Sequence, residues 1–224
     1  MKQFQLGHSP LQVSALCLGC MYFGTTVDEV TAFALLDQFV ESGGTFLDTA
    51  NCYSFWVPGG SGDESELLLG RWLRARDNRQ HIVLATKVGS RLMFAGGSWP
   101  RDAEGMSAAV IEQQIEASLR RLQTDHVDLY YSHLDDRATP FEETLEAFDR
   151  LVQSGKVRVI GCSNMHAWRL AQALDISKAH GWARYSCVQQ RHSYLRPKHG
   201  ADLGGQVAVN NELLDFCRSD ASVT

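Results

Sequence analysis

Short apolar segments alternate with helix-length amphipathic segments along this chain of 224 residues, and this alternation limits the possible folds more than any other feature. Each pair is typical of a β-strand followed by an α-helix, which indicates a parallel sheet with helical crossovers. Strands are predicted at residues 14–19, 45–48, 82–87, 126–133, 157–164 and 186–190. Helices are predicted at residues 27–42, 61–75, 107–122, from 140 onward, 166–179 and 211–218.

Two sheet architectures fit this alternation. The strand ends recur roughly every thirty to forty-five residues, as in a (β/α)8 TIM barrel. The alternative is an open doubly wound sheet, but a dinucleotide-binding sheet of that kind usually carries a GxGxxG turn after its first strand. The sequence contains neither that turn nor a Walker motif. We therefore expect one α/β domain over residues 1–224, a TIM barrel covering about six βα units, preceded by a hairpin at 4–13.

Composition excludes several classes of function. A net charge of −5 gives no reason to expect a nucleic-acid partner. No apolar run reaches the roughly 18 residues needed to span a membrane, and no secretory signal is recognisable, so we expect a cytoplasmic protein. The six cysteines suggest a reducing compartment rather than a disulfide scaffold. Cys17 and Cys20 have CxxC spacing, but no second pair or close histidine completes a zinc site, so no metal is expected.

Four titratable residues lie at or just beyond the ends of successive predicted strands: Asp48, Tyr53, Lys87 and His133. In a barrel, the carboxyl ends of the strands meet on one face, so these side chains should converge. Tyr53 could then pass a proton to a carbonyl oxygen, with Lys87 lowering its pKa and Asp48 holding Lys87 in place. His133 could donate a hydrogen bond that orients the same oxygen.

A carbonyl carbon that is reduced must also receive a hydride, which no side chain supplies and a nicotinamide cofactor does. Ser163, Asn164 and Gln189 follow the next two strands, and their amide and hydroxyl groups suit a nicotinamide carboxamide. Ser163 and Asn164 could instead cap the following helix. Tyr22 and Trp56, together with Phe23, Phe94 and Trp99, could form an apolar wall for the substrate, or could pack on their own loops.

The sequence resembles the aldo-keto reductase family over nearly its whole length. The motifs that carry the resemblance are Gly44-Thr45-Phe46-Leu47-Asp48-Thr49-Ala50 through Tyr53, Thr86-Lys87, Asp128-Leu129-Tyr130-Tyr131-Ser132-His133 and Gly155-Lys156-Val157-Arg158-Val159-Ile160-Gly161-Cys162-Ser163-Asn164. The resemblance implies that Asp48, Tyr53, Lys87 and His133 are the catalytic residues. It also implies a (β/α)8 barrel that reduces aldehydes or ketones with NADPH, or with NADH.

The same resemblance assigns the cofactor-binding residues. The loop Gly19-Cys20-Met21-Tyr22-Phe23-Gly24 is similar to the family's first loop, which touches the cofactor and shapes the substrate pocket. It implies cofactor contacts from Gly19, Met21, Asp48, Ser163, Asn164 and Gln189. It implies a substrate pocket that includes Tyr22, Trp56 and His133.

Other interpretations remain open. The sequence ends where a seventh strand would start, so we expect a truncated barrel that binds NADPH weakly or not at all. A non-catalytic or regulatory barrel subunit, or an inactive fragment, is the alternative to a reductase. His133 with Asp135 and Asp136 could suggest a metal site, but a neighbouring lysine would repel a divalent ion. A hydrolase or isomerase on a similar barrel would need a nucleophile elbow or metal ligands, and the sequence shows neither. The sequence specifies neither a particular carbonyl substrate nor an oligomeric state.

Overall fold

The computed structural model describes residues 1–198, 200–220 and 222–224. Its strands are β1 (Gln3–Gln5), β2 (Gln12–Ser14), β3 (Cys17–Gly19), β4 (Phe46–Asp48), β5 (Val83–Val88), β6 (Val127–Ser132), β7 (Val157–Ser163) and β8 (Tyr185–Gln189). Its helices are α1 (Glu29–Glu41), α2 (Glu64–Arg76), α3 (Ala108–Leu122), α4 (Phe141–Gln153), α5 (Ala167–His180) and α6 (Asn211–Ser219), with a short 3-10 helix, η1 (Arg79–His81). Every strand and helix predicted from the alternation is present, with ends shifted by a few residues.

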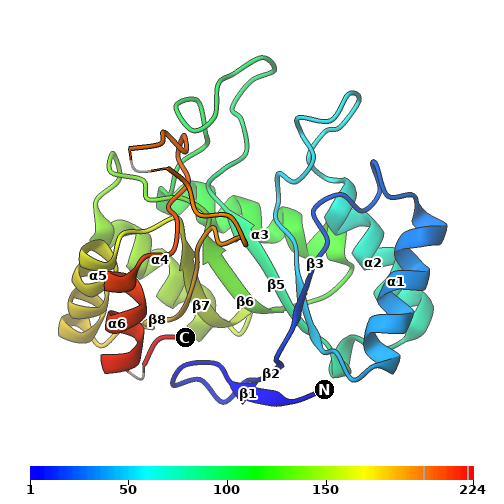
Figure 1. Ribbon diagram of the computed structural model, residues 1–224, viewed down its shortest axis with the longest axis horizontal. Helices are drawn as coiled ribbons and strands as arrows, with labels where there is room; N and C mark the ends of the chain where they lie inside the picture. Colours follow the sequence, from blue (N-terminus) through cyan, green and yellow to red (C-terminus); the bar gives the residue numbers. More distant parts are fainter. Residues whose placement is uncertain (199, 221) are drawn as a thin grey trace.

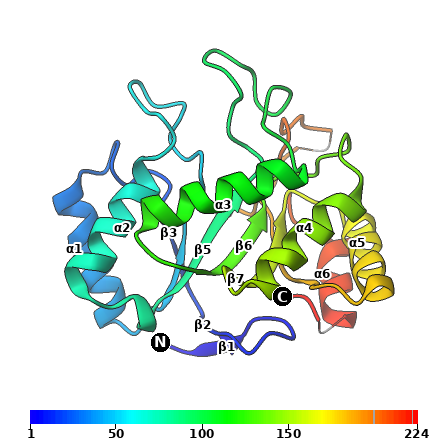
Figure 2. The same cartoon turned by 180° about the vertical axis from the view of Figure 1, so that it is seen from behind.

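The main sheet has six parallel strands in the sequential order β3-β4-β5-β6-β7-β8. Figure 1 shows the sheet curving around an interior, with the β1–β2 hairpin beneath the strands. Figure 2, from behind, shows the helices arranged along its outer face. A sequential, curved parallel sheet with helices on its outside is a partial (β/α) barrel, which confirms the predicted fold class.

Two apolar clusters hold this arrangement together. The larger one lies between the sheet and the helices and includes the fully buried Trp72, Tyr130 and Phe148. The smaller one lies inside the barrel, where Leu6 and Val13 of the hairpin region meet inward-facing strand residues such as Leu129 and Tyr131. The hairpin therefore closes the amino-terminal end of the strands and leaves their carboxyl-terminal ends for a site.

Helix starts follow the capping residues. Asp28 accepts a hydrogen bond from the Thr31 amide at 2.8 Å and begins α1, and Ser107 caps α3 as its sequence predicts. Gly43 follows α1 with a φ of 82°, a conformation that glycine adopts at little cost. Ala32 and Leu36 are the buried residues of α1 and face the sheet, whereas Val30 is 83% exposed.

The last residues extend the sheet at β8. The Thr224 amide donates to the Ser186 carbonyl at 3.0 Å, and the Thr224 carbonyl accepts from the Val188 amide at 2.9 Å. This is the bonding of a neighbouring parallel strand, where a seventh strand was expected. Among the described residues, no helix has the length and apolar character needed to cross a bilayer. Cys17 and Cys20 are free thiols.

Candidate active site

Parallel pairing of β4 with β5 brings Asp48 and Lys87 together, since both lie at the carboxyl ends of their strands. The Lys87 side chain is completely buried. Its Nζ lies 2.6 Å from both carboxylate oxygens of Asp48, 2.8 Å from the Thr49 carbonyl and 2.6 Å from the Tyr53 hydroxyl. An ammonium has three protons to donate, so these acceptors satisfy it fully. The predicted contact among Asp48, Tyr53 and Lys87 is present.

The protonation state of Tyr53 differs from the expectation. Burial, and then the Asp48 carboxylate, raise the pKa of Tyr53 well above its ordinary value of 10.0. Asp48 offsets the charge of Lys87, and burial disfavours the charged form of Tyr53, so the expected lowering of the Tyr53 pKa was wrong. Tyr53 therefore carries its proton at neutral pH, which is the form that a proton donor needs.

His133 follows β6 and is held by its backbone. Its amide donates to the Val88 carbonyl at 2.9 Å, and its carbonyl accepts from the Asn164 side-chain amide at 3.0 Å. Burial first, and then the Lys87 charge, lower the pKa of His133 well below 6.5, so the ring is neutral at neutral pH. The ring lies edge-to-face against Tyr53, with 5.7 Å between centroids.

Tyr53 and His133 open onto a cavity of about 650 Å3 at the carboxyl ends of the strands. Tyr22 and Trp56 also line it, and their ring centroids lie 6.3 Å apart in an edge-to-face contact. Of the other aromatic residues considered, Trp99 lines the cavity, Phe23 is buried in the core and Phe94 is 56% exposed. Lining residues that sequence reasoning missed are Cys52, Phe55, Ser90, Gln190, Arg191, His192 and Gln206.

Ser163, Asn164 and Gln189 line the same cavity. Both polar atoms of Asn164 already have protein partners: its Nδ2 donates to the His133 carbonyl and its Oδ1 accepts from the Val207 amide at 3.2 Å. The alternative role as helix caps is not seen, because α5 begins after His166. The hydroxyl of Ser163 and the amide of Gln189 fit a carboxamide, which needs both donors and acceptors.

The remaining predicted cofactor residues lie differently. Met21 lines the cavity, whereas Gly19 and Asp48 do not. Gly19 ends β3 beside open space, since a Cβ added there would meet nothing within 4 Å. Asp48 is 6% exposed and its carboxylate binds Lys87. Asp48 thus does not face the cavity itself but contacts Lys87, which in turn contacts Tyr53 at the cavity edge.

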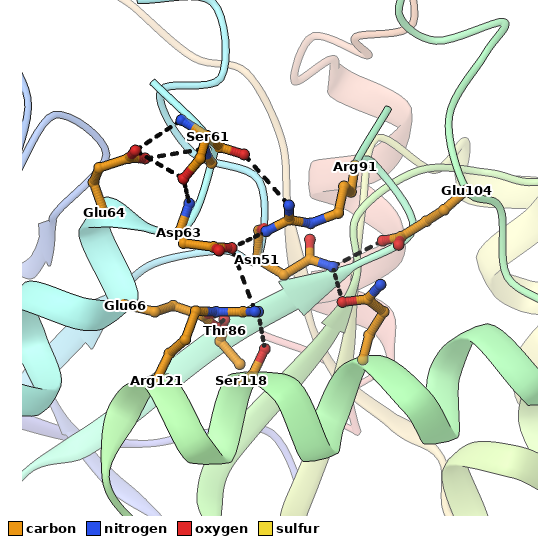
Figure 3. Close-up of polar contacts among 12 residues, drawn as sticks. Asn51, Ser61, Asp63, Glu64, Glu66, Thr86, Arg91, Glu104, Ser118 and Arg121 are labelled. Carbon is orange, nitrogen blue, oxygen red and sulfur yellow. Dashed lines mark hydrogen bonds and ion pairs between the residues drawn. The ribbon is translucent and has the colours of Figure 1, made fainter. Parts of the chain in front are cut away.

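A polar network behind the site joins the loop that carries Tyr53 to α2, α3 and the loop after β5 (Figure 3). The Asn51 side chain donates to Glu104 at 2.8 Å and to Gln114 at 3.2 Å. Glu104 also accepts from the Gly89 amide at 2.9 Å. Arg91 donates to Asp63 and to the Asn51 carbonyl. Long loops on both sides of the cavity are thereby tied to each other.

The deeper part of this network is ionic. Arg121 of α3 bonds Glu66 of α2 at 2.6 Å, and Thr86 of β5 donates to the same carboxylate at 2.5 Å. Figure 3 shows these side chains meeting between the two helices and the sheet. The carboxylates of Asp135 and Asp136, near the site, also have protein partners. Asp135 forms ion pairs with Arg137 and Arg169, and Asp136 accepts a hydrogen bond from the Met106 amide. Neither aspartate is arranged with His133 as a metal ligand.

Known proteins provide an independent comparison. The chain is 40% identical to the uncharacterized oxidoreductase YrpG of Bacillus subtilis over 196 residues, which cover 87% of this chain and 59% of that protein. It is 40% identical to norsolorinic acid reductase stcV of Emericella nidulans, covering 80% of this chain and 46% of that one. It is 34% identical to aldo-keto reductase ausK of Aspergillus calidoustus, covering 87% and 48%.

The chain thus spans about half the length of the curated relatives it matches. The model of the Aldo/keto reductase family matches residues 15–223, from the start of the barrel to its last described strand pairing. The strand order, the buried Asp48–Lys87 pair and the cavity beside Tyr53 and His133 agree with this match. The chain belongs to the aldo/keto reductase family.

Proposed function

We propose that the protein reduces an aldehyde or ketone to an alcohol with NADPH, with NADH as the alternative cofactor, and that Tyr53 donates the proton. One observation carries the proposal: the Tyr53 hydroxyl lies 2.6 Å from the Lys87 ammonium at the edge of a cavity that His133 shares. A bound nicotinamide would supply the hydride. Reduction also needs a proton donor and a polarised carbonyl, which these residues can provide.

The charge of each residue suits it to a different step of the proposed reduction. Tyr53 holds a proton at neutral pH, and Lys87 lies close enough to stabilise the tyrosinate that forms when the proton leaves. Asp48 keeps Lys87 oriented through both of its oxygens. The neutral ring of His133 can donate one hydrogen bond to the carbonyl oxygen, which orients it toward Tyr53.

The cavity indicates the substrate class. Tyr22, Phe55, Trp56 and Trp99 give it aromatic walls, which favour an apolar carbonyl compound. Several relatives are named norsolorinic acid reductases, which is consistent with a carbonyl substrate here. Met21, Ser163 and Gln189 are proposed to contact the nicotinamide, with Gly19 beside it. We further propose a cytoplasmic enzyme.

Replacing Tyr53 with phenylalanine tests the proposal. In a chain comparable in length to the relatives, Tyr53→Phe removes the donated proton and should lower kcat for a panel of aldehydes and ketones at least a hundredfold. NADPH binding by that chain, followed by nicotinamide fluorescence, should persist. Tyr194→Phe, at a residue that is 100% exposed, is the matched control and should leave kcat unchanged. Equal turnover by Tyr53→Phe and the parent would refute the role of Tyr53.

A second measurement separates the reductase from a non-catalytic barrel subunit. NADPH would be titrated into these 224 residues and into a longer chain comparable in length to the relatives. Binding by the longer chain alone supports the reductase proposal and a barrel completed by additional residues. Submicromolar binding by these residues alone would contradict the expectation of weak binding. Absence of binding by both chains would favour the non-catalytic alternative.

A further inference from the structure

We infer that Cys52 is a positioning residue, whose thiol hydrogen-bonds His133 Nδ1 and thereby keeps the ring proton on Nε2. The inference rests on the proposed reductase function, because it concerns the hydrogen bond that His133 would give to the substrate. Cys52 Sγ lies 3.8 Å from His133 Nδ1, within the range for a sulfur hydrogen bond. Cys52 is 2% exposed, and both residues line the cavity.

The contact joins two separate loops. Cys52 immediately precedes Tyr53 in the loop after β4, and His133 follows β6. The backbone of His133 is fixed on both sides by Val88 and Asn164, so the remaining freedom is that of its ring. Among the described residues, Cys52 is the side chain that hydrogen-bonds a nitrogen of this ring.

The protons can be assigned to atoms. Burial raises the pKa of Cys52 to about 12, so the sulfur keeps its proton at neutral pH. Burial and Lys87 lower the pKa of His133, so the ring holds one proton. A ring nitrogen with a free lone pair accepts a hydrogen bond well, whereas sulfur is a weak acceptor. The favourable arrangement is therefore S–H donating to an unprotonated Nδ1, which leaves the proton on Nε2.

The tautomer matters for the proposed chemistry. A neutral imidazole has one donor and one acceptor, and only the donor can bond a carbonyl oxygen. A ring with its proton on Nδ1 would present a lone pair to the carbonyl oxygen and repel it. The same protonated thiol is a poor nucleophile, since the thiolate is the reactive form, so a positioning role fits Cys52 better than covalent chemistry.

The test compares three cysteine variants. Cys52→Val has a similar shape but no donor, and Cys52→Ser keeps a hydroxyl donor. Cys162→Val is the control for the same change at a buried cysteine on the outer face of the sheet, in the apolar cluster. Imidazole ¹⁵N chemical shifts report the tautomer directly, and His133→Asn identifies the His133 signals. Circular dichroism melts would confirm that each variant is folded.

We expect the parent and Cys52→Ser to show a protonated Nε2 and a hydrogen-bonded Nδ1. Cys52→Val should lose the Nδ1 hydrogen-bond shift and populate both tautomers. In the longer chain, its kcat should fall about two- to tenfold, the range expected from one modest hydrogen bond, with KM and NADPH affinity unchanged. Cys52→Ser should recover most of kcat, and Cys162→Val should match the parent in both readouts.

The two proposals fail differently. A parent protein with its proton on Nδ1, or a Cys52→Val spectrum identical to the parent, would overturn the role of Cys52 whether or not the protein reduces carbonyls. The expected tautomer in a protein that turns over no carbonyl compound would refute the reductase function and leave the contact standing. The NMR readout needs no turnover, so it is decisive in either case.

Discussion

Glu104 offers the most informative perturbation of the loops around the cavity. Its Oε1 accepts hydrogen bonds from Asn51 Nδ2 at 2.8 Å and from the Gly89 amide at 2.9 Å. Asn51 lies two residues before Tyr53, and Gly89 lies two residues after Lys87. One oxygen atom therefore ties together the two loops that leave the catalytic strands.

The magnitude follows from these contacts. In Glu104→Leu, the Gly89 amide loses its acceptor, while Asn51 keeps Gln114 as a partner. A buried donor without a partner costs about 1–3 kcal/mol, and we expect a loss of that size in the free energy of unfolding. For a chain of this size that corresponds to a fall in Tm of roughly 2–12 °C. Glu104→Gln keeps an oxygen at the same place and should cost less than about 1 kcal/mol.

The same loops position Tyr53, so turnover should respond as well. We expect Glu104→Leu to lower kcat roughly tenfold or more, because small displacements of a proton donor slow the reaction strongly. Glu104→Gln should keep kcat near that of the parent. The assays are thermal unfolding by circular dichroism and steady-state carbonyl reduction. If Glu104→Leu had the same Tm and kcat as Glu104→Gln, the proposal that Glu104 holds the two loops together would be refuted.

Two further predictions concern the charged groups of the site. Lys87→Met leaves the Asp48 carboxylate buried without its partner and should destabilise the protein by about 3–5 kcal/mol, measured by urea denaturation. Adding Asp48→Asn to this variant should recover part of the lost stability. If the double variant recovered none, the two residues would not be coupled. His133 has a lowered pKa when folded, so the unfolded chain binds more protons below pH 6.5 and stability should fall there by up to about 1.4 kcal/mol per pH unit. His133→Asn should make the stability profile shallower below pH 6.5, and an unchanged slope would contradict burial of the neutral ring.

The convergence of the residues that we propose as catalytic could be predicted, because the carboxyl ends of barrel strands meet on one face. Asp48, Lys87 and His133 each follow a short apolar strand, and parallel strands bring their carboxyl ends together. The structure places Asp48, Lys87 and Tyr53 in direct contact and sets the His133 ring against Tyr53. The order of the strands in the sheet follows the chain, so neighbours in sequence became neighbours in space.

Other features could not be predicted in this way. The raised pKa of Tyr53 depends on how completely Asp48 offsets the charge of Lys87 and on how deeply the hydroxyl is buried. Glu104 lies in the long loop 88–105, where local patterns specify no contact. Its partner Asn51 is 53 positions away in sequence.

The sequence by itself determined the alternation of strands and helices, the parallel sheet and the identity of the residues at the strand ends. These depend on local periodicity and on a general property of parallel sheets. Only the tertiary structure decided the protonation of Tyr53 and His133, the contact of Cys52 with the ring and the bonds of Glu104. Those depend on burial and on distances between residues far apart in the chain, and the energy of a charge or a hydrogen bond changes with both.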